Sequence, residues 1–288
     1  MKIIYFYLLF VMWGSLAQAQ DEQPLNLPAR SQTALTGSAF MKKIAHMDGG
    51  RREQAMVQEI LLGNIPSFLR KLTPIDMKLT AGPYRGQTLR YWTLPDYIAI
   101  GSDSDFIRVP LNMYSIEKLS EKLDLSLPTK KMVDDIYNQA QVKLTPMPIV
   151  CKSNISSTAN IVLHNEMLRG QILTSKYAPG LLVAGHKKDV VQSRRVLRKP
   201  GSIAIYGWHR SSTDPIQQLS TAHAAGYADY SHGIRLVSNH VQLGTAQLDL
   251  RDILENKSYA SLLSSEGVIP QISRMKTMHS NIALASHP

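Results

Sequence analysis

The stretch SHGIRLVSNHVQLG, residues 231–244, has the pattern that decides the fold class. Its aliphatic residues come in short runs, and polar residues gather at the ends of those runs. This is typical of short strands whose joining loops present the chemistry. The segments LLVAGHKKDVV (181–191) and GSIAIYGWH (201–209) have the same pattern. The three segments together predict a sheet that is mostly antiparallel.

Helical and strand-like patterns alternate on both sides of these segments. Strands rich in β-branched and aromatic residues are expected at 75–79, 89–100 and 106–111. Helices are expected in two pieces over 39–62, broken at Asp48-Gly49-Gly50, and at 115–123, 129–140, 157–172 and 250–263. Thr129 and Ser157 are suitable N-caps for two of them. The fold class that follows is α+β, a mostly antiparallel sheet with flanking helices.

The first twenty residues have the pattern of a secretory signal peptide. Lys2 precedes an apolar run, and Ala17-Gln18-Ala19 provides small residues for cleavage near Ala19. We expect a secreted or periplasmic protein with no membrane span once this leader is removed. Its single cysteine, Cys151, excludes an internal disulfide and is interpreted as an incidental thiol.

The remaining chain is long enough for one large domain. Residues 21–38 are polar, contain two prolines, and predict a disordered lead-in. Residues 39–270 are expected to form a single α+β domain, with an alternative boundary near 144–150, and residues 271–288 a loose tail.

The chain is strongly basic, with a formal net charge of +10, of which the leader contributes one unit through Lys2. A basic protein is attracted to polyanions. No basic motif interleaved with aromatic residues is present, so nucleic acid is not the expected partner. An exported protein meets cell-envelope polymers instead.

Four of the nine histidines lie between His186 and His232, which is the clearest functional signal in the sequence. Histidine exchanges protons and binds metals near neutral pH. The candidate catalytic residues are His209, His223, Asp229, Ser231 and His232. The candidate substrate-binding residues are His186, Lys188, Tyr206 and Arg235.

These residues allow more than one chemistry. His209, His223, Asp229 and His232 could hold a divalent metal such as zinc, with water completing the site. Without a metal, a histidine oriented by an aspartate could act as general base, with Ser231 as nucleophile. Adjacent side chains on a strand point to opposite faces, so a histidine other than His232 would serve Ser231. Arg235 lies within an apolar run and is expected to reach a carboxylate, either of a substrate or of a structural partner such as Asp229.

The motif SHGIRL at 231–236 resembles the signature of L,D-transpeptidases, exported enzymes that cross-link peptidoglycan. That signature is Ser-His-Gly-Cys followed by an aliphatic residue and Arg, and here Ile234 follows Gly233 with no Cys. The family's upstream Ile-His-Gly corresponds to Ile205-Tyr206-Gly207. The resemblance covers about thirty residues and implies a related sheet with altered chemistry.

Two further resemblances are present. Ser220, His223, Gly226, Ala228 and Asp229 are similar to the metal-binding motif of zinc D-Ala-D-Ala peptidases, with spacings changed by one residue. The chain as a whole resembles a group of exported bacterial proteins through LPTKKMVDDIYNQA (127–140), GHKKDVV (185–191) and YADYSHGIRLV (227–237), a resemblance that implies no particular function.

The expected function is that of an exported hydrolase or transferase acting on a cell-envelope polymer, with the peptide part of peptidoglycan first among the candidates. Two alternatives stay open. One is a non-catalytic protein that binds an envelope polymer or other polyanion through a transpeptidase-like sheet without the Cys. The other is a secreted polysaccharide-degrading enzyme that uses Tyr206 and a histidine as acid and base.

Overall fold

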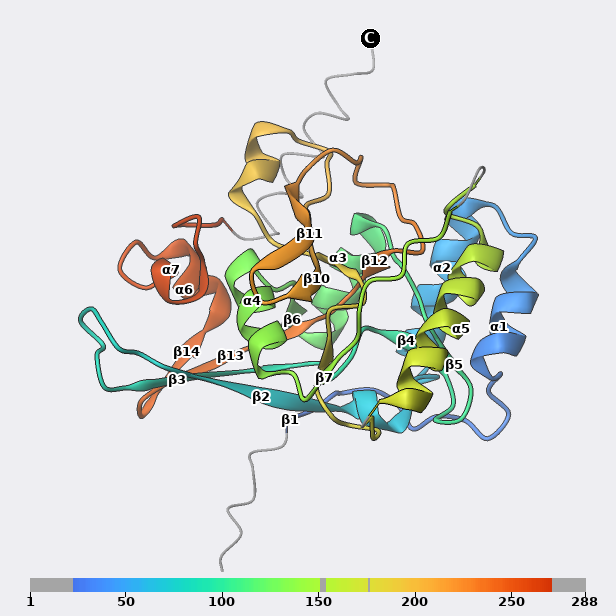
Figure 1. Ribbon diagram of the computed structural model, residues 1–288, viewed down its shortest axis with the longest axis horizontal. Coiled ribbons are helices and arrows are strands. Elements are labelled where there is room, and N and C mark those ends of the chain that lie inside the picture. The colour runs from blue at the N-terminus through green and yellow to red at the C-terminus, as the bar shows by residue number, and fades with distance from the viewer. Residues whose placement is uncertain (1–22, 151–153, 176, 271–288) are drawn as a thin grey trace, which may run out of the picture.

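The structure is a computed structural model that describes residues 23–150, 154–175 and 177–270 (Figure 1). The expected signal peptide and loose tail, and Cys151, lie outside these residues. The protein has the α+β class predicted from the sequence, with a mostly antiparallel main sheet flanked by helices. No helix in the described part is long and apolar enough to span a membrane.

The larger sheet has the strand order β1-β2-β3-β13-β14, with β6 paired to β13, and every pairing is antiparallel. Its strands are β1 (Gln23–Pro24), β2 (Lys71–Lys78), β3 (Thr88–Thr93), β6 (Leu125–Ser126), β13 (Val237–Leu243) and β14 (Ala246–Asp249). Alternate residues of β13 are buried because the helices cover one side of the sheet.

The smaller sheet carries the predicted site. Its order is β11-β10-β9-β12, in which β9 pairs antiparallel with β10 and parallel with β12. The strands are β9 (Lys188–Val190), β10 (Ile205–Ser211), β11 (Asp214–Ser220) and β12 (His232–Gly233). Two further pairs are β4 (Ala99–Gly101) with β5 (Phe106–Arg108), and β7 (Val142–Lys143) with β8 (Val183–Ala184).

Two of the helices begin directly after the caps predicted for them, Thr129 and Ser157. The α-helices are α1 (Gly37–Ile44), α2 (Gly49–Leu61), α3 (Met113–Leu123), α4 (Lys130–Gln139), α5 (Thr158–Thr174), α6 (Leu250–Glu255) and α7 (Ala260–Leu263). Two 3₁₀ helices are η1 (Ser67–Arg70) and η2 (Arg194–Arg198). Asp48, Thr129 and Ser157 each accept a hydrogen bond from a backbone N–H in the first turn of α2, α4 and α5.

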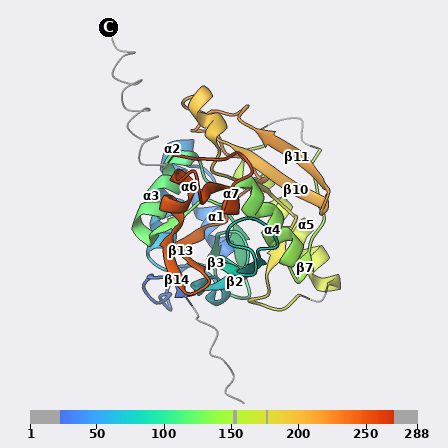
Figure 2. The same cartoon turned by 90° about the vertical axis from the view of Figure 1, so that its left-hand side faces the viewer.

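Helix α4 lies between the two sheets, where it contacts β2 of the larger sheet and β10 of the smaller one (Figures 1 and 2). Helices α1, α2 and α5 gather on the opposite side of the molecule from α6 and α7 (Figure 1). The main hydrophobic cluster joins buried side chains from Leu25 to Leu236. Both sides of the alternative boundary near 144–150 therefore contribute to one core.

Residues 23–38 differ from the expected disordered lead-in. Strand β1 pairs with β2, Leu25 is buried, and Arg30 donates to Asn64 Oδ1 at 2.8 Å. The polar, proline-containing composition did not predict this ordered structure, because the partners of these residues, β2 and Asn64, lie far along the chain.

The helix expected at 250–263 is two short helices, since the chain leaves the helical conformation at Asn256. The strand expected across 181–191 is also two strands. Gly185, with φ of 100°, separates β8 from β9, and a Cβ there would lie 2.6 Å from Leu144 O.

Candidate functional site

The predicted site residues lie on two faces of the smaller sheet. The alternation of Lys187, Lys188 and Asp189 along the chain shows this. Successive side chains of a strand point to opposite faces. Lys188 is partly exposed on one face, together with His232, its register partner in β12. Lys187 and Asp189 are buried on the other face. The sequence signal at 186–189 therefore belongs to two different environments.

Asp229 organises the turn that leads into β12. Its Oδ1 accepts hydrogen bonds from the Ser231 N–H at 2.8 Å and the Ser231 hydroxyl at 2.6 Å, and its Oδ2 accepts from the Tyr227 hydroxyl at 2.8 Å. Burial alone would raise the pKa of the Asp229 carboxyl, but His232 and these hydrogen bonds outweigh burial and lower it. Asp229 is thus ionised, and the Ser231 hydroxyl is bound to it.

His232 is enclosed without a hydrogen-bond partner. Its side chain is 1% exposed, and neither ring nitrogen is hydrogen-bonded among the described residues. Burial lowers the pKa of His232 to about 4, against the opposing effect of Asp229, so the imidazole is neutral near pH 7. A neutral imidazole with a free nitrogen can accept a proton.

Two further rings surround this imidazole. Tyr227 meets His232 edge-on with ring centroids 5.6 Å apart, and it stacks on His223 at 4.3 Å. His223 lies 5.8 Å from His232, centroid to centroid, and is partly exposed. The structure therefore brings His223, Asp229, Ser231 and His232 together at one end of the sheet, with Lys188 beside them. We call these five residues and Tyr227 the His232 site.

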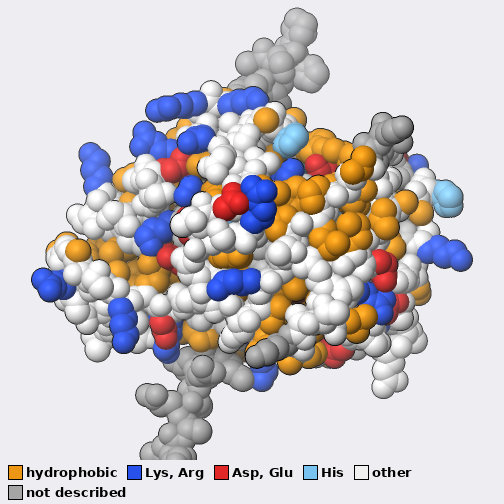
Figure 3. All heavy atoms as spheres, viewed as in Figure 1, with side chains coloured by type: hydrophobic (Ala, Val, Ile, Leu, Met, Phe, Trp, Pro, Cys, Tyr) orange, Lys and Arg blue, Asp and Glu red, His pale blue; other side chains and the backbone are white. Residues whose placement is uncertain are grey.

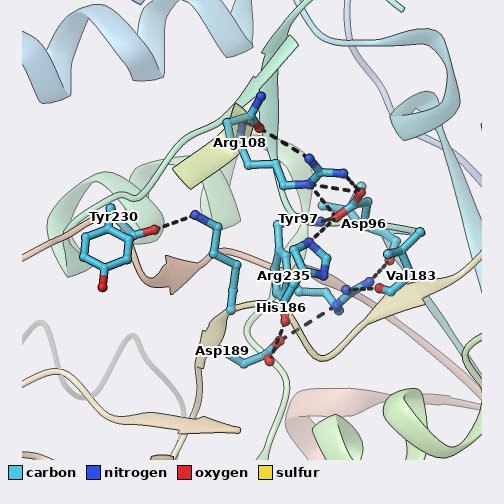
Figure 4. A network of polar contacts seen from close by, with 11 residues as sticks. Asp96, Tyr97, Arg108, Val183, His186, Asp189, Tyr230 and Arg235 are labelled. Carbon is cyan, nitrogen blue, oxygen red and sulfur yellow. Dashed lines mark hydrogen bonds and ion pairs between the residues drawn. The ribbon is translucent and has the colours of Figure 1, made fainter. Parts of the chain in front are cut away.

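On the other face, Asp96 and Arg108 form an ion pair in which both side chains are 1% exposed (Figure 4). The Nε2 atom of His186 lies 3.3 Å from Asp96 Oδ1, and His186 is 0% exposed. The expectation that His186 binds substrate finds no support in this position, because its ring is enclosed beside a buried ion pair.

Arg235 belongs to the same interior network (Figure 4). It donates to the carbonyl oxygens of Leu94 and Val183, and its Nε lies 3.8 Å from Asp189 Oδ1. The partner of Arg235 is therefore a structural carboxylate, as one of the two alternatives expected, and it is Asp189 in place of Asp229. Arg235 is 1% exposed, so its guanidinium serves the interior and is not presented to a substrate.

Tyr206 and His209 form a third group with helix α4. The Tyr206 hydroxyl donates to Asp134 Oδ1 at 2.7 Å, and His209 Nε2 lies 3.2 Å from the same oxygen. Lys130 Nζ lies 3.1 Å from Asp134 Oδ2. This group fastens α4 to β10, and the Tyr206 hydroxyl is already engaged, which removes support for Tyr206 as a substrate-binding or acid/base residue.

The predicted metal set is not assembled. The described residues contain no group of three or more His, Cys, Asp or Glu side chains that could hold a metal ion. His209 packs on Tyr137 and Tyr206, whereas His223 and His232 pack around Tyr227. The prediction that His209, His223, Asp229 and His232 together form a metal site is therefore corrected.

Several residues of these groups escaped the sequence reasoning. Tyr227 and Trp208 stand next to predicted residues and carry groups that hydrogen-bond or stack, a signal that could have been used. Lys187 is 1% exposed and donates to the Tyr230 carbonyl, and burial lowers its pKa to about 7. Only the folded chain brings Asp96 and Asp134 next to the residues that they bind, so the local sequence contains no signal for them.

Comparison with known proteins gives no further identification, because no protein-family model, curated protein or solved structure matches this chain. The resemblance of SHGIRL to L,D-transpeptidases therefore stays a prediction. Ile234, which follows Gly233 where that signature has its Cys, is 0% exposed and packs in the main core.

Proposed function

We propose that this protein is an exported hydrolase or transferase that acts on a cell-envelope polymer, with the peptide part of peptidoglycan as its substrate. The observation that carries the proposal is His232, a buried neutral imidazole whose two nitrogens are unpartnered and whose turn is held by an ionised Asp229. The expected leader, the basic charge and the resemblance of SHGIRL support the choice of polymer.

In the proposed reaction, His232 takes a proton from the attacking water or hydroxyl group. Asp229 stabilises the resulting imidazolium and fixes the turn, because its negative charge favours the protonated form of His232. The protonated His232 then donates this proton to the leaving group, so the base is regenerated. His223 is the second imidazole of the site, and burial lowers its pKa, so it is also neutral near pH 7. Ser231 is assigned to the turn and not to nucleophilic attack, since its hydroxyl donates to Asp229.

The test is incubation of the purified protein, without its leader, with peptidoglycan sacculi, followed by mass spectrometry of the released fragments. Chelator-resistant release of peptides is expected. His232→Ala should lower the rate by about 10²- to 10⁴-fold, the usual contribution of a general base. His46→Ala is the matched control, because His46 is exposed and far from the site in sequence.

Two outcomes would contradict the proposal. Equal rates for His232→Ala and His46→Ala would remove His232 from the chemistry. No release by the unaltered protein would remove the hydrolase, and would favour the non-catalytic binding protein. That second candidate is supported by Ile234, which leaves the transpeptidase-like motif without a thiol.

A further inference from the structure

Trp208 has an unusual backbone conformation beside the His232 site. Its φ is 54°, in the left-handed region that a bulky side chain rarely adopts. It follows Gly207, with φ of 106°, and the pairing of β10 with β11 shifts register between Ile205 and Gly207. Strained residues of this kind persist where the surrounding structure enforces them, often at functional sites.

The irregularity brings the indole of Trp208 to Lys188. The backbone N–H of Trp208 donates to Lys187 O at 3.0 Å, which fixes the irregular segment of β10 against the residue before β9. Lys188 Nζ lies 5.0 Å from the centroid of the indole ring. An ammonium over a tryptophan ring is a favourable contact, and it holds the Lys188 side chain over this face of the sheet.

Both residues carry donors that are not used within the described structure. Trp208 is 5% exposed, and its Nε1–H has no hydrogen-bond partner among the described residues. Among the described residues, Lys188 forms no ion pair with a carboxylate. An indole N–H and an ammonium are donors only, so their common ligand must supply an acceptor, and the charge of Lys188 favours an anionic one.

This pair of donors lies next to the proposed base. Lys188 is the direct register partner of His232 across the parallel pairing of β9 with β12. Neighbouring strands are about 4.8 Å apart, so a group bound at Lys188 reaches the His232 site. The positive charge of Lys188 also acts on His232, whose pKa it helps to lower after burial itself.

We propose that Lys188 and Trp208 form a subsite for a carboxylate of the substrate, an inference that rests on the proposed function of the His232 site. The ammonium supplies the charge, and the indole N–H supplies a directed hydrogen bond. The bond that reacts then lies close to a free carboxylate, so the substrate is acidic at the reacting end.

The experiment uses tryptophan fluorescence of the leaderless chain, in which Trp92 and Trp208 are the two tryptophans. Trp92→Phe leaves Trp208 as the reporter. The probe is acetyl-D-alanyl-D-alanine with a free C-terminal carboxylate, compared with its C-terminal amide. We expect saturable quenching by the acid, and binding of the amide weaker by about tenfold or more, the loss of one charge-assisted contact.

Substitutions then test the two donors. In the Trp92→Phe background, Lys188→Met should weaken binding of the acid by about tenfold, whereas Lys118→Met, at an exposed position of α3, should leave it unchanged. Trp208→Phe, measured by calorimetry, keeps a ring beneath Lys188 but lacks the N–H and should also bind more weakly. Far-ultraviolet circular dichroism checks that each variant is folded.

Further probes show which class of molecule supplies the carboxylate, and they test explanations other than the subsite. Saturable binding of an oligosaccharide of glucuronic acid, preferred over the peptide, would keep the subsite and move the substrate to acidic polysaccharide. Equal affinity for acid and amide, or tighter binding of inorganic phosphate, would overturn the subsite. Acid-selective binding without any turnover of sacculi would contradict the proposed function and leave the subsite standing.

Discussion

At the scale of single residues, Arg108 and Asp96 form an ion pair that is enclosed in the interior of the protein. Arg108 Nη2 lies 2.5 Å from Asp96 Oδ2, its Nε lies 3.0 Å from Asp96 Oδ1, and both side chains are 1% exposed. The guanidinium lowers the pKa of the Asp96 carboxyl well below its usual range, although burial alone would raise it. Removing one partner would leave the other charged and buried.

We predict that Arg108→Ala lowers the free energy of unfolding by about 3–5 kcal/mol, the usual effect of breaking a buried pair. Urea titration followed by circular dichroism measures this. Arg210→Ala removes the same side chain from the exposed pair with Asp214, and should change the free energy by about 1 kcal/mol or less. Similar losses of unfolding free energy in the two variants would show that the enclosed pair stabilises the protein no more than the exposed pair does.

The sequence identified the residue types of the site better than their partners. The spacing of His223, Asp229 and His232 on one turn was sufficient to predict that they lie together. The partners of Arg235 could not be predicted, because Leu94 lies 141 residues away along the chain. Similarly, the alternation of Lys187, Lys188 and Asp189 predicts two faces but does not say which face is enclosed.

At the scale of elements, the short strand β12 is held by a close approach that only glycine allows. A Cβ on Gly233 would lie 2.5 Å from Tyr97 Cε1 and 2.6 Å from Lys187 Cβ. Both neighbours are themselves buried, so they have little freedom to move. The pairing of β12 with β9 places His232 beside Lys188, and therefore depends on this contact.

Gly233→Ala is expected to lower the free energy of unfolding by about 1–3 kcal/mol through overpacking, and to disturb the His232 site. Gly226→Ala is the control, since a Cβ there meets only the Tyr114 ring at 3.8 Å. Thermal or urea unfolding of both variants compares them. If Gly233→Ala were as stable as Gly226→Ala, the close approach would not constrain β12.

Elements that carry a local signal were predicted well. The caps Thr129 and Ser157 mark the starts of two helices, because each side chain satisfies a backbone N–H of its own helix. The break expected at Asp48-Gly49-Gly50 separates α1 from α2. The breaks at Gly185 and Asn256 were missed. At Gly185 the cause is the distant Leu144 carbonyl, which leaves no trace in the local pattern.

At the scale of the whole molecule, buried histidines make stability depend on pH. Burial lowers the pKa of His186 and of His232 to about 4, and lowers that of His164 still further, from an ordinary value of 6.5. Between about pH 4 and 6.5 the unfolded chain binds protons that the folded chain excludes, so stability falls as the pH falls. Asp189 opposes this, since burial raises its pKa to about 6 and the folded carboxyl keeps a proton there.

Burial also lowers the pKa of His223 and raises those of Glu53 and Asp135, so four histidines act against three carboxyls. We predict a net loss of unfolding free energy between about pH 7 and pH 5, measured by urea titration at each pH. His164→Phe keeps a ring beside Tyr230 but cannot titrate, so it should reduce this loss. His46→Ala should retain it. A free energy of unfolding that is constant or rises on acidification would show that the buried histidines are charged.

The basic residues are spread over the face shown in Figure 3 and are not gathered into one patch. On this face, the attraction to polyanions that composition predicts is therefore diffuse and does not point to a site. Class and element order follow from local patterns, whereas the docking of residues 23–38 and the joining of both halves in one core are decided by long-range contacts.

The alternation along β9 limits how this protein can diverge during evolution. A one-residue insertion or deletion next to the strand would turn Lys188 inward and expose Lys187 and Asp189, so the interior and the His232 site would fail together. Insertions and deletions of one residue next to β9 are therefore not expected in related proteins. Related proteins with new substrates should instead vary exposed residues of the loop before β12, such as Ala222 and Ala224, which flank His223.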